Sequence, residues 1–117
     1  MVAKRRVEIG AGKAALADWR AGSADRTTVA AAVRYTLEEV SARAPGNSVE
    51  VRVPPFGVAQ CVQGPRHTRG TPPNVIECDA ATWLEMATGQ LTWADAIAAG
   101  RVAASGLRAD LAGLLPL

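Results

Sequence analysis

Residues 64–74 contain the side chains whose types are most typical of a binding site. The sequence GPRHTRGTPPN holds the only histidine of the chain, His67, between Arg66 and Arg69. Guanidinium groups donate paired hydrogen bonds to phosphates and carboxylates, so these three residues are candidate ligands of an anion. A solvated, proline-stiffened loop between two strands would have the same composition. The residues alone leave both interpretations open.

Cys61, His67 and Cys78 include the soft and imidazole ligands that zinc prefers, but their spacing is not that of a zinc site. Zinc-binding sequences usually bring cysteines in closely spaced pairs, and no such pair is present. A nucleophilic pair of Cys61 and His67 would lack a third group to orient it. We therefore expect no metal and no cofactor.

Three carboxylates, Asp79, Asp95 and Asp110, lie where helices are expected to begin. At such positions a carboxylate accepts hydrogen bonds from free backbone N–H groups, so capping is the favoured interpretation over catalysis. The chain also lacks the glycine-rich phosphate loops and the HExxH pattern of common catalytic sites. The sequence thus predicts a protein that is not an enzyme.

The length of 117 residues fits one domain, which we expect over residues 9–117. Three of the positive charges behind the net charge of +2 fall in residues 4–6, so residues 1–8 are predicted to be a flexible basic tail. No basic face for nucleic acid is apparent. No apolar run approaches the roughly 20 residues of a membrane span, and no signal peptide is recognisable. These features predict a cytoplasmic protein with reduced cysteines and no stable membrane insertion.

Two helices are predicted at the start of the domain, over residues 9–21 and 26–44. In the second, apolar residues recur at Val29, Val33, Leu37 and Val40, which is a helical period. Its other face offers the pairs Arg34–Glu38 and Glu39–Arg43, spaced for ion pairs along a helix. The residues Pro-Gly-Asn at 45–47 end this helix.

The remaining elements are four strands and three shorter helices. Alternating valines at 49–53 predict a strand, and a short turn joins it to an antiparallel partner over 58–63. Further strands are predicted at 74–78 and 101–105, and helices at 82–88, 93–99 and 107–114. Asp79 and Thr92 are the expected N-caps. Runs of helices and strands in this order predict an α+β fold, a mostly antiparallel sheet covered on one face by helices.

The run DAATWLEMATGQLTWADAIAAGRVAASGLRADLAGLL, which begins at Asp79, resembles the C-terminal part of sterol carrier protein domains. The shared features include Gly89, Gly100 and Gly106, each of which ends an element. The chain is most similar in organisation to the short, single-domain bacterial members of that family. Two departures are that four strands are recognisable where the family commonly has five, and that the helix at 9–21 has no counterpart.

The resemblance implies a lipid carrier that holds a fatty acyl, acyl-CoA or sterol-like ligand between helices and sheet, with Arg66, His67 and Arg69 as candidate headgroup ligands. The candidate lining is apolar and comprises Val51, Val53, Phe56, Trp83, Leu84, Ala87, Leu91, Trp93, Ile97, Val102, Leu107 and Leu111. An apolar core has the same composition as an apolar cavity. The alternative is therefore a non-catalytic interaction or accessory module with a packed core and no lipid tunnel, which would act either as a homodimer or beside a larger enzyme.

Overall fold

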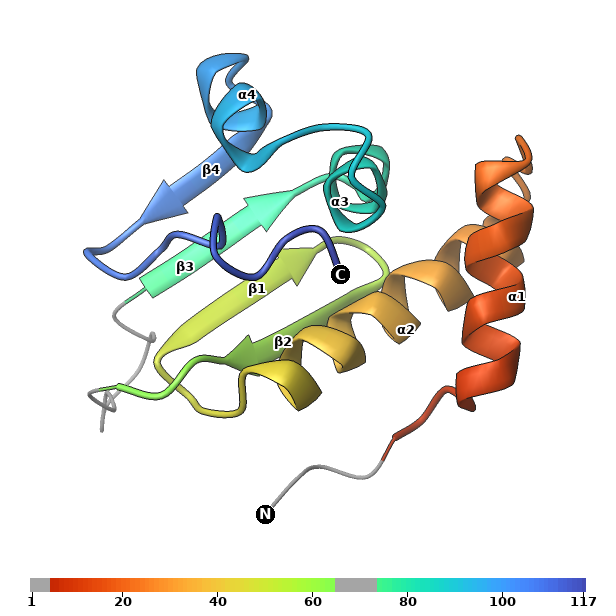
Figure 1. The fold of residues 1–117 in the computed structure, drawn as a ribbon, viewed down its shortest axis with the longest axis horizontal. Helices are drawn as coiled ribbons and strands as arrows, with labels where there is room; N and C mark the ends of the chain where they lie inside the picture. Colours follow the sequence, from red (N-terminus) through yellow and green to blue (C-terminus); the bar gives the residue numbers. More distant parts are fainter. Residues whose placement is uncertain (1–4, 65–73) are drawn as a thin grey trace.

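Four helices and four strands are found in residues 5–64 and 74–117, the parts of the chain that the computed structural model describes (Figure 1). In chain order they are α1 (Ile9–Arg20), α2 (Arg26–Arg43), β1 (Val49–Val53), β2 (Gly57–Cys61), β3 (Asn74–Cys78), α3 (Ala80–Ala87), α4 (Trp93–Ala98) and β4 (Val102–Ser105). Each begins and ends within two residues of its predicted bounds.

The sheet has the strand order β2-β1-β3-β4. β1 pairs antiparallel with β2 and parallel with β3, and β3 pairs antiparallel with β4. Two of the three pairings are thus antiparallel. The predicted α+β class and the predicted hairpin of the first two strands are confirmed.

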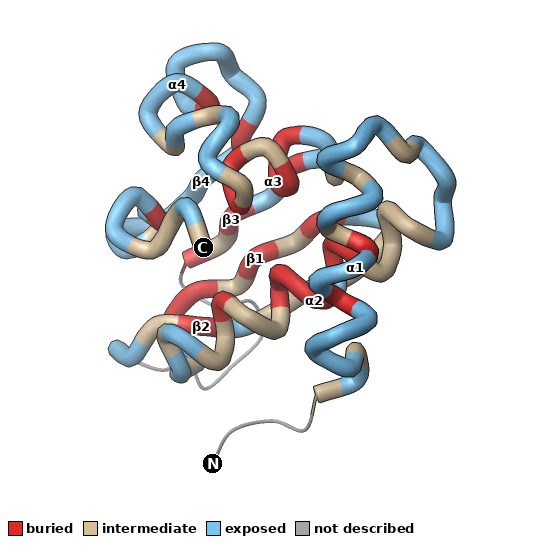
Figure 2. The backbone as a smooth tube through the Cα atoms, turned by 45° about the vertical axis from the view of Figure 1, so that its right-hand side comes forward, coloured by how far each residue is buried: buried red, intermediate tan, exposed pale blue. Residues whose placement is uncertain are grey.

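One face of this sheet is buried and the other faces solvent. Val49, Val51 and Val53 have no exposed surface, whereas Glu50 and Arg52 between them are only partly buried on the opposite face. α2 and α3 lie over the buried face, and α1 packs against α2 (Figures 1 and 2). The period of two along β1 therefore decides which face the helices cover.

Asp79 and Thr92 cap α3 and α4 as the sequence predicts, and Asp25 caps α2. The side chains of Asp25, Asp79 and Thr92 accept hydrogen bonds from the backbone N–H three residues later, at 3.2, 2.8 and 3.1 Å. These bonds satisfy donors that a helix leaves unpaired in its first turn. The hydrogen bonds from Thr82 also hold the pKa of Asp79 below its usual value.

The prediction of a helix over residues 107–114 is wrong, because these residues form turns and irregular structure instead. Their backbone N–H groups find other acceptors. Arg108 N donates to Asn74 Oδ1 at 2.8 Å, and Ala112 N donates to Asp110 Oδ1 at 2.8 Å. Leucines at helical spacing suggested a helix, but a tertiary contact and a local aspartate turn take the donors that a helix would use.

Of the two ion pairs predicted along α2, only one forms. Arg43 Nε lies 3.2 Å from a carboxylate oxygen of Glu39. Arg34 instead donates from Nε to the carbonyl oxygen of Phe56 at 3.0 Å, which ties α2 to the turn before β2. The carboxylate of Glu38 accepts the backbone N–H groups of residues 6 and 7 at 2.7 and 2.9 Å. These two hydrogen bonds to Glu38 hold the chain just before α1 against α2.

Candidate functional site

Most of the predicted apolar lining is brought together between the helices and the sheet. Val51, Val53, Trp83, Leu84, Ala87, Val102 and Leu111 are buried, and Phe56, Leu91 and Trp93 pack partly buried against this core. Ile97 and Leu107 do not join them, because their side chains are 40% and 105% exposed. The core is closed in this state: Trp83, Leu84 and Leu111 have no exposed surface.

The C-terminal segment, residues 109–117, covers part of this core. Leu111 is fully buried, and Leu114, Leu115 and Leu117 pack against the core cluster. In Figure 1 the segment passes over the helix-covered face of the sheet and ends beside α3. In the described chain its hydrogen bond to α3 runs from Leu117 N to the carbonyl oxygen of Ala87, at 3.0 Å. Apolar side chains rather than regular structure thus hold this segment in place.

A buried hydrogen bond joins the two helices that cover the sheet. Trp83 Nε1 of α3 donates to Thr36 Oγ1 of α2 at 2.8 Å. Thr36 Oγ1 in turn lies 2.8 Å from the carbonyl oxygen of Ala32 within α2. Both side chains are almost fully buried. The bond satisfies the one polar atom of a tryptophan that otherwise lies among apolar side chains.

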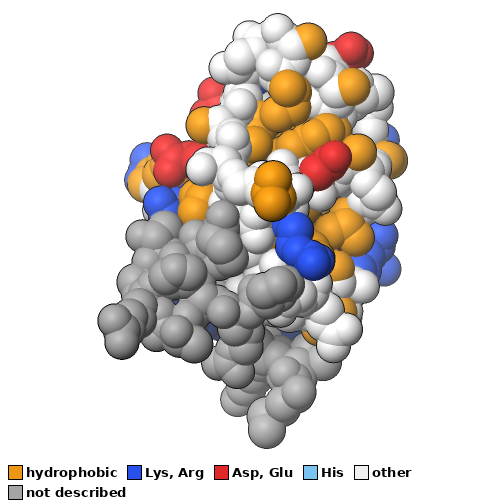
Figure 3. All heavy atoms as spheres, turned by 90° about the vertical axis from the view of Figure 1, so that its left-hand side faces the viewer, with side chains coloured by type: hydrophobic (Ala, Val, Ile, Leu, Met, Phe, Trp, Pro, Cys, Tyr) orange, Lys and Arg blue, Asp and Glu red, His pale blue; other side chains and the backbone are white. Residues whose placement is uncertain are grey.

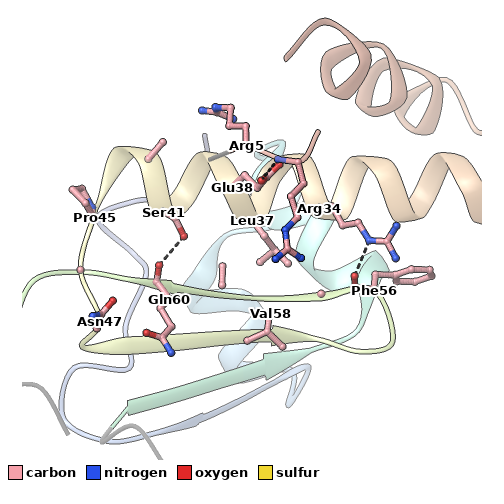
Figure 4. A pocket seen from close by; sticks show the side chains of 15 residues that line it. Arg5, Arg34, Leu37, Glu38, Ser41, Pro45, Asn47, Phe56, Val58 and Gln60 are labelled. Carbon is pink, nitrogen blue, oxygen red and sulfur yellow. Dashed lines mark hydrogen bonds between the residues drawn. The ribbon is translucent and has the colours of Figure 1, made fainter. Parts of the chain in front are cut away.

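A groove of about 1000 Å³ runs between α2 and the outer edge of β2, and we call it the edge groove (Figure 4). β2 is an edge strand, with β1 on one side only. The wall from α2 includes Arg34, Leu37 and Ser41, and Ser41 Oγ donates to the carbonyl oxygen of Gln60 at 2.6 Å. The lining is completed by Arg5, Arg6, Glu38, Ala42, Pro45, Gly46, Asn47, Phe56, Gly57, Val58, Ala59 and Gln60.

The charges around the edge groove are mostly positive. Arg5, Arg6 and Arg34 stand against the single carboxylate of Glu38. The guanidinium of Arg5 pairs with Glu39 at 2.5 Å, which fixes the chain before α1 at the rim. The groove thus combines these charged groups with apolar lining residues such as Leu37, Phe56 and Val58.

Only Phe56 of the twelve predicted lining residues also lines the edge groove. The groove was missed by sequence reasoning because its walls lie far apart in the chain. One signal is visible afterwards: Gly57 and Ala59, two small residues at a spacing of two, lie on the helix-facing side of β2. The missing side chain of Gly57 allows α2 to approach closely, because a Cβ there would lie 3.1 Å from Leu37 Cδ1.

The two cysteines are buried in the core as free thiols. Burial raises the pKa of Cys61 to about 11. Burial, and to a lesser degree the charge of Asp79, raises the pKa of Cys78 to about 12. Thiols that stay protonated at neutral pH are poor nucleophiles and poor metal ligands. In residues 5–64 and 74–117 no group of three potential metal ligands occurs.

Arg66, His67 and Arg69 lie outside the described residues, so the anion site remains a prediction. The face that bears β4 shows hydrophobic side chains gathered over its upper half, with single charged groups between them (Figure 3).

In the described residues no helix is long and apolar enough to cross a membrane.

A family model described as bacterial SCP ortholog matches residues 25–117. The chain belongs to this family of sterol carrier protein orthologues. The match starts at Asp25, the N-cap of α2, so it includes the sheet, α2 to α4 and the C-terminal segment. α1 lies outside the matched residues. This agrees with the sequence comparison above, in which the helix at 9–21 has no counterpart in sterol carrier protein domains. No curated protein matches the chain.

Proposed function

We propose that this SCP orthologue is a non-catalytic lipid carrier that holds a fatty acyl, acyl-CoA or sterol-like ligand between the helices and the sheet, beneath the C-terminal segment. The proposal rests on the C-terminal segment, residues 109–117, which covers the core. Leu111, Leu114, Leu115 and Leu117 fill apolar space over the sheet from a segment without helix or strand. Such a segment can move aside at a lower cost than a packed helix, because few backbone hydrogen bonds must break.

The exchange of leucine side chains for a lipid chain is energetically reasonable. Each methylene transferred from water into an apolar site contributes about 0.8 kcal/mol. An acyl chain of a dozen methylenes would gain roughly 10 kcal/mol before the cost of exposing the displaced leucines. In such an opened state the predicted lining, including Trp83 and Leu84, would contact the ligand.

The edge groove is the weaker candidate for the lipid chain. Its lining includes three arginines, Glu38, Ser41 and Gln60, and an acyl chain laid along it would remove part of these groups from water. The apolar residues of the chain are concentrated on the other side of α2, in the core.

Trp83 provides a direct test, because a dibrominated fatty acid quenches tryptophan emission on contact. The chain contains three tryptophans, so the variant Trp19→Phe/Trp93→Phe leaves Trp83 as the only emitter. We expect the brominated fatty acid, but not its unbrominated parent, to quench Trp83 in a saturable way. Native mass spectrometry of the same samples should show a one-to-one adduct.

Two results would decide against this proposal. An adduct without quenching of Trp83 would place the ligand outside the core. No adduct with fatty acid, acyl-CoA or sterol would favour the alternative function, a packed interaction or accessory module. That alternative is supported by the closed core, and it predicts a dimer in light scattering.

The headgroup ligands Arg66, His67 and Arg69 and the cytoplasmic location belong to the same proposal. Two buried free thiols are typical of a reducing compartment. The variant Arg66→Ala/Arg69→Ala should bind acyl-CoA more weakly than the wild type while binding the free fatty acid equally well. Unchanged acyl-CoA affinity would remove these residues from the site.

A further inference from the structure

β4 is the edge strand at the end of the sheet opposite β2. Edge strands are usually protected by lysine, proline or a bulge, and the sequence VAAS of β4 has no charged residue and no proline. Ala103, Ala104 and Ser105 are exposed, and their small side chains leave the backbone accessible. β4 is therefore an edge at which another strand can approach closely.

The hydrogen bonds around β2 establish which residues of each strand face which neighbour. The carbonyl oxygen of Gln60 accepts from α2, and Val62 N donates to Ala44 O just after α2, so even-numbered residues of β2 face away from β1. The register then directs the odd-numbered residues of β1 to β2 and its even-numbered residues to β3. In a parallel pair a residue bonds to the two neighbours of its partner. Glu50 is registered with Val75, so Val75 itself faces β4.

The same alternation determines the outward groups of β4. β3 and β4 pair Val75 with Ser105, so the odd-numbered residues of β4 bond to β3. The N–H and C=O groups of Val102 and Ala104 therefore point away from the sheet. No other hydrogen bond within the described residues reaches these four groups.

Two exposed apolar side chains flank this edge. Ile97 lies in α4, before β4, and is 40% exposed, and Leu107 lies two residues after β4 and is fully exposed. Apolar side chains gather on this side of the molecule in Figure 3. Exposed apolar surface beside an unpaired strand edge is typical of a protein interface.

We propose that two copies of this chain pair antiparallel through β4 and join their four-stranded sheets into one, about a two-fold axis at Ala103. This axis places Val102 of each copy opposite Ala104 of the other. The outward N–H and C=O groups of both copies then form four hydrogen bonds, and none of these groups stays unpaired. The same pairing brings Leu107 of each copy toward the end of the other copy's α4, where Ile97 lies. A second copy thus matches the edge in both hydrogen bonding and apolar contact.

The proposed interface is small, because only four residues of each copy form the strand pair. Stable interfaces bury roughly 1200 Å² or more, so we expect a reversible dimer that dissociates on dilution. The pairing leaves the core closed and does not depend on the lipid proposal. Lipid adducts, rather than the oligomeric state, therefore decide between a carrier and a packed module.

Amide hydrogen exchange followed by NMR tests the strand pairing on the unaltered full chain, at concentrations where sedimentation shows monomer and dimer. The N–H groups of Val102 and Ala104 should exchange at least tenfold more slowly in the dimer, because they gain acceptors. Those of Ala103 and Ser105 already bond to β3 and should be protected equally in both states. A dimer that leaves exchange at Val102 and Ala104 unchanged would overturn the proposal.

Two variants should weaken the dimer at least tenfold in sedimentation. Ala104→Pro removes a donor that faces the second copy and none that bonds to β3. Leu107→Asp replaces an apolar contact by a charge, and the full exposure of Leu107 means that the monomer should fold as before. Val58→Asp is the control, because Val58 is also exposed, at 60%, but lies on the opposite edge strand, so this variant should dimerise as the wild type does.

Three further outcomes would contradict the pairing through β4. These are a wild type that stays monomeric at about 1 mM, a Leu107→Asp variant that dimerises as tightly as the wild type, and a Val58→Asp variant that loses the dimer to the same degree. Circular dichroism checks the folding of Ala104→Pro. If that variant does not fold, Leu107→Asp and the exchange pattern of the wild type still decide.

Discussion

At the scale of single residues, the bond between Trp83 and Thr36 has the most testable consequence. Thr36→Val keeps the shape of the side chain but removes the acceptor of the buried indole N–H. An unsatisfied buried donor costs about 1–3 kcal/mol, so the free energy of unfolding should fall by that amount. Urea unfolding measures it. The exposed Thr27 provides the control, because Thr27→Val should change stability by less than about 0.5 kcal/mol.

The cysteines give a prediction about pH. The folded protein holds the pKa of Cys61 near 11 and that of Cys78 near 12, against 9.0 for an accessible thiol. Between these values the unfolded chain has lost thiol protons that the folded chain keeps, so alkaline pH favours unfolding. The stability contributed by the protonated thiols is complete below pH 9 and declines as the pH rises toward 12.

The variant Cys61→Ala/Cys78→Ala isolates this effect from other groups that titrate at high pH. Each thiol contributes at most about 1.4 kcal/mol per pH unit to the slope of stability against pH. Urea unfolding at several pH values from 8 to 10.5 should therefore show a shallower decline for the variant than for the wild type. Equal slopes would mean that the thiols ionise alike in the folded and unfolded chains.

At the scale of elements, the connection between α2 and β1 depends on Gly46. Its φ is +149°, and a Cβ at this position would lie 2.2 Å from the carbonyl oxygen of Val62. Gly46→Ala should lower the free energy of unfolding by about 2 kcal/mol or more, through backbone strain and displacement of Val62. Gly113 has no atom within 4 Å of such a Cβ, so Gly113→Ala is the control and should be neutral or slightly stabilising in thermal unfolding.

The elements also show what the sequence can and cannot predict. β1 was predictable because its valines alternate with polar residues, and α2 because Val29, Val33, Leu37 and Val40 share a face. These patterns are local. The turns after Gly106 were not predictable, because the acceptor for Arg108 N is Asn74, which is 34 residues away. Most of the apolar candidates could be predicted because apolar side chains are buried together in the core. The edge groove could not be predicted, because it depends on how α2 lies across β2, and no local sequence pattern determines that arrangement.

At the scale of the whole molecule, the helices and the C-terminal segment divide one buried sheet face between them. α2 lies over the β1–β2 side, and α3 together with the C-terminal segment lies toward β3 (Figures 1 and 2). The edge groove and the proposed lipid site consequently lie on opposite sides of α2. A ligand beneath the C-terminal segment would displace leucines without disturbing the sheet.

This division predicts how amide hydrogen exchange responds to a lipid. In the proposed carrier state the ligand takes the place of Leu111 and its neighbours, so residues 109–117 should exchange faster in the loaded protein than in the free one. β1 and β3 should keep their protection, because their ladder bonds are unaffected. Slower exchange of residues 109–117 on loading would instead mean that the segment closes over the ligand without giving up its own place in the core.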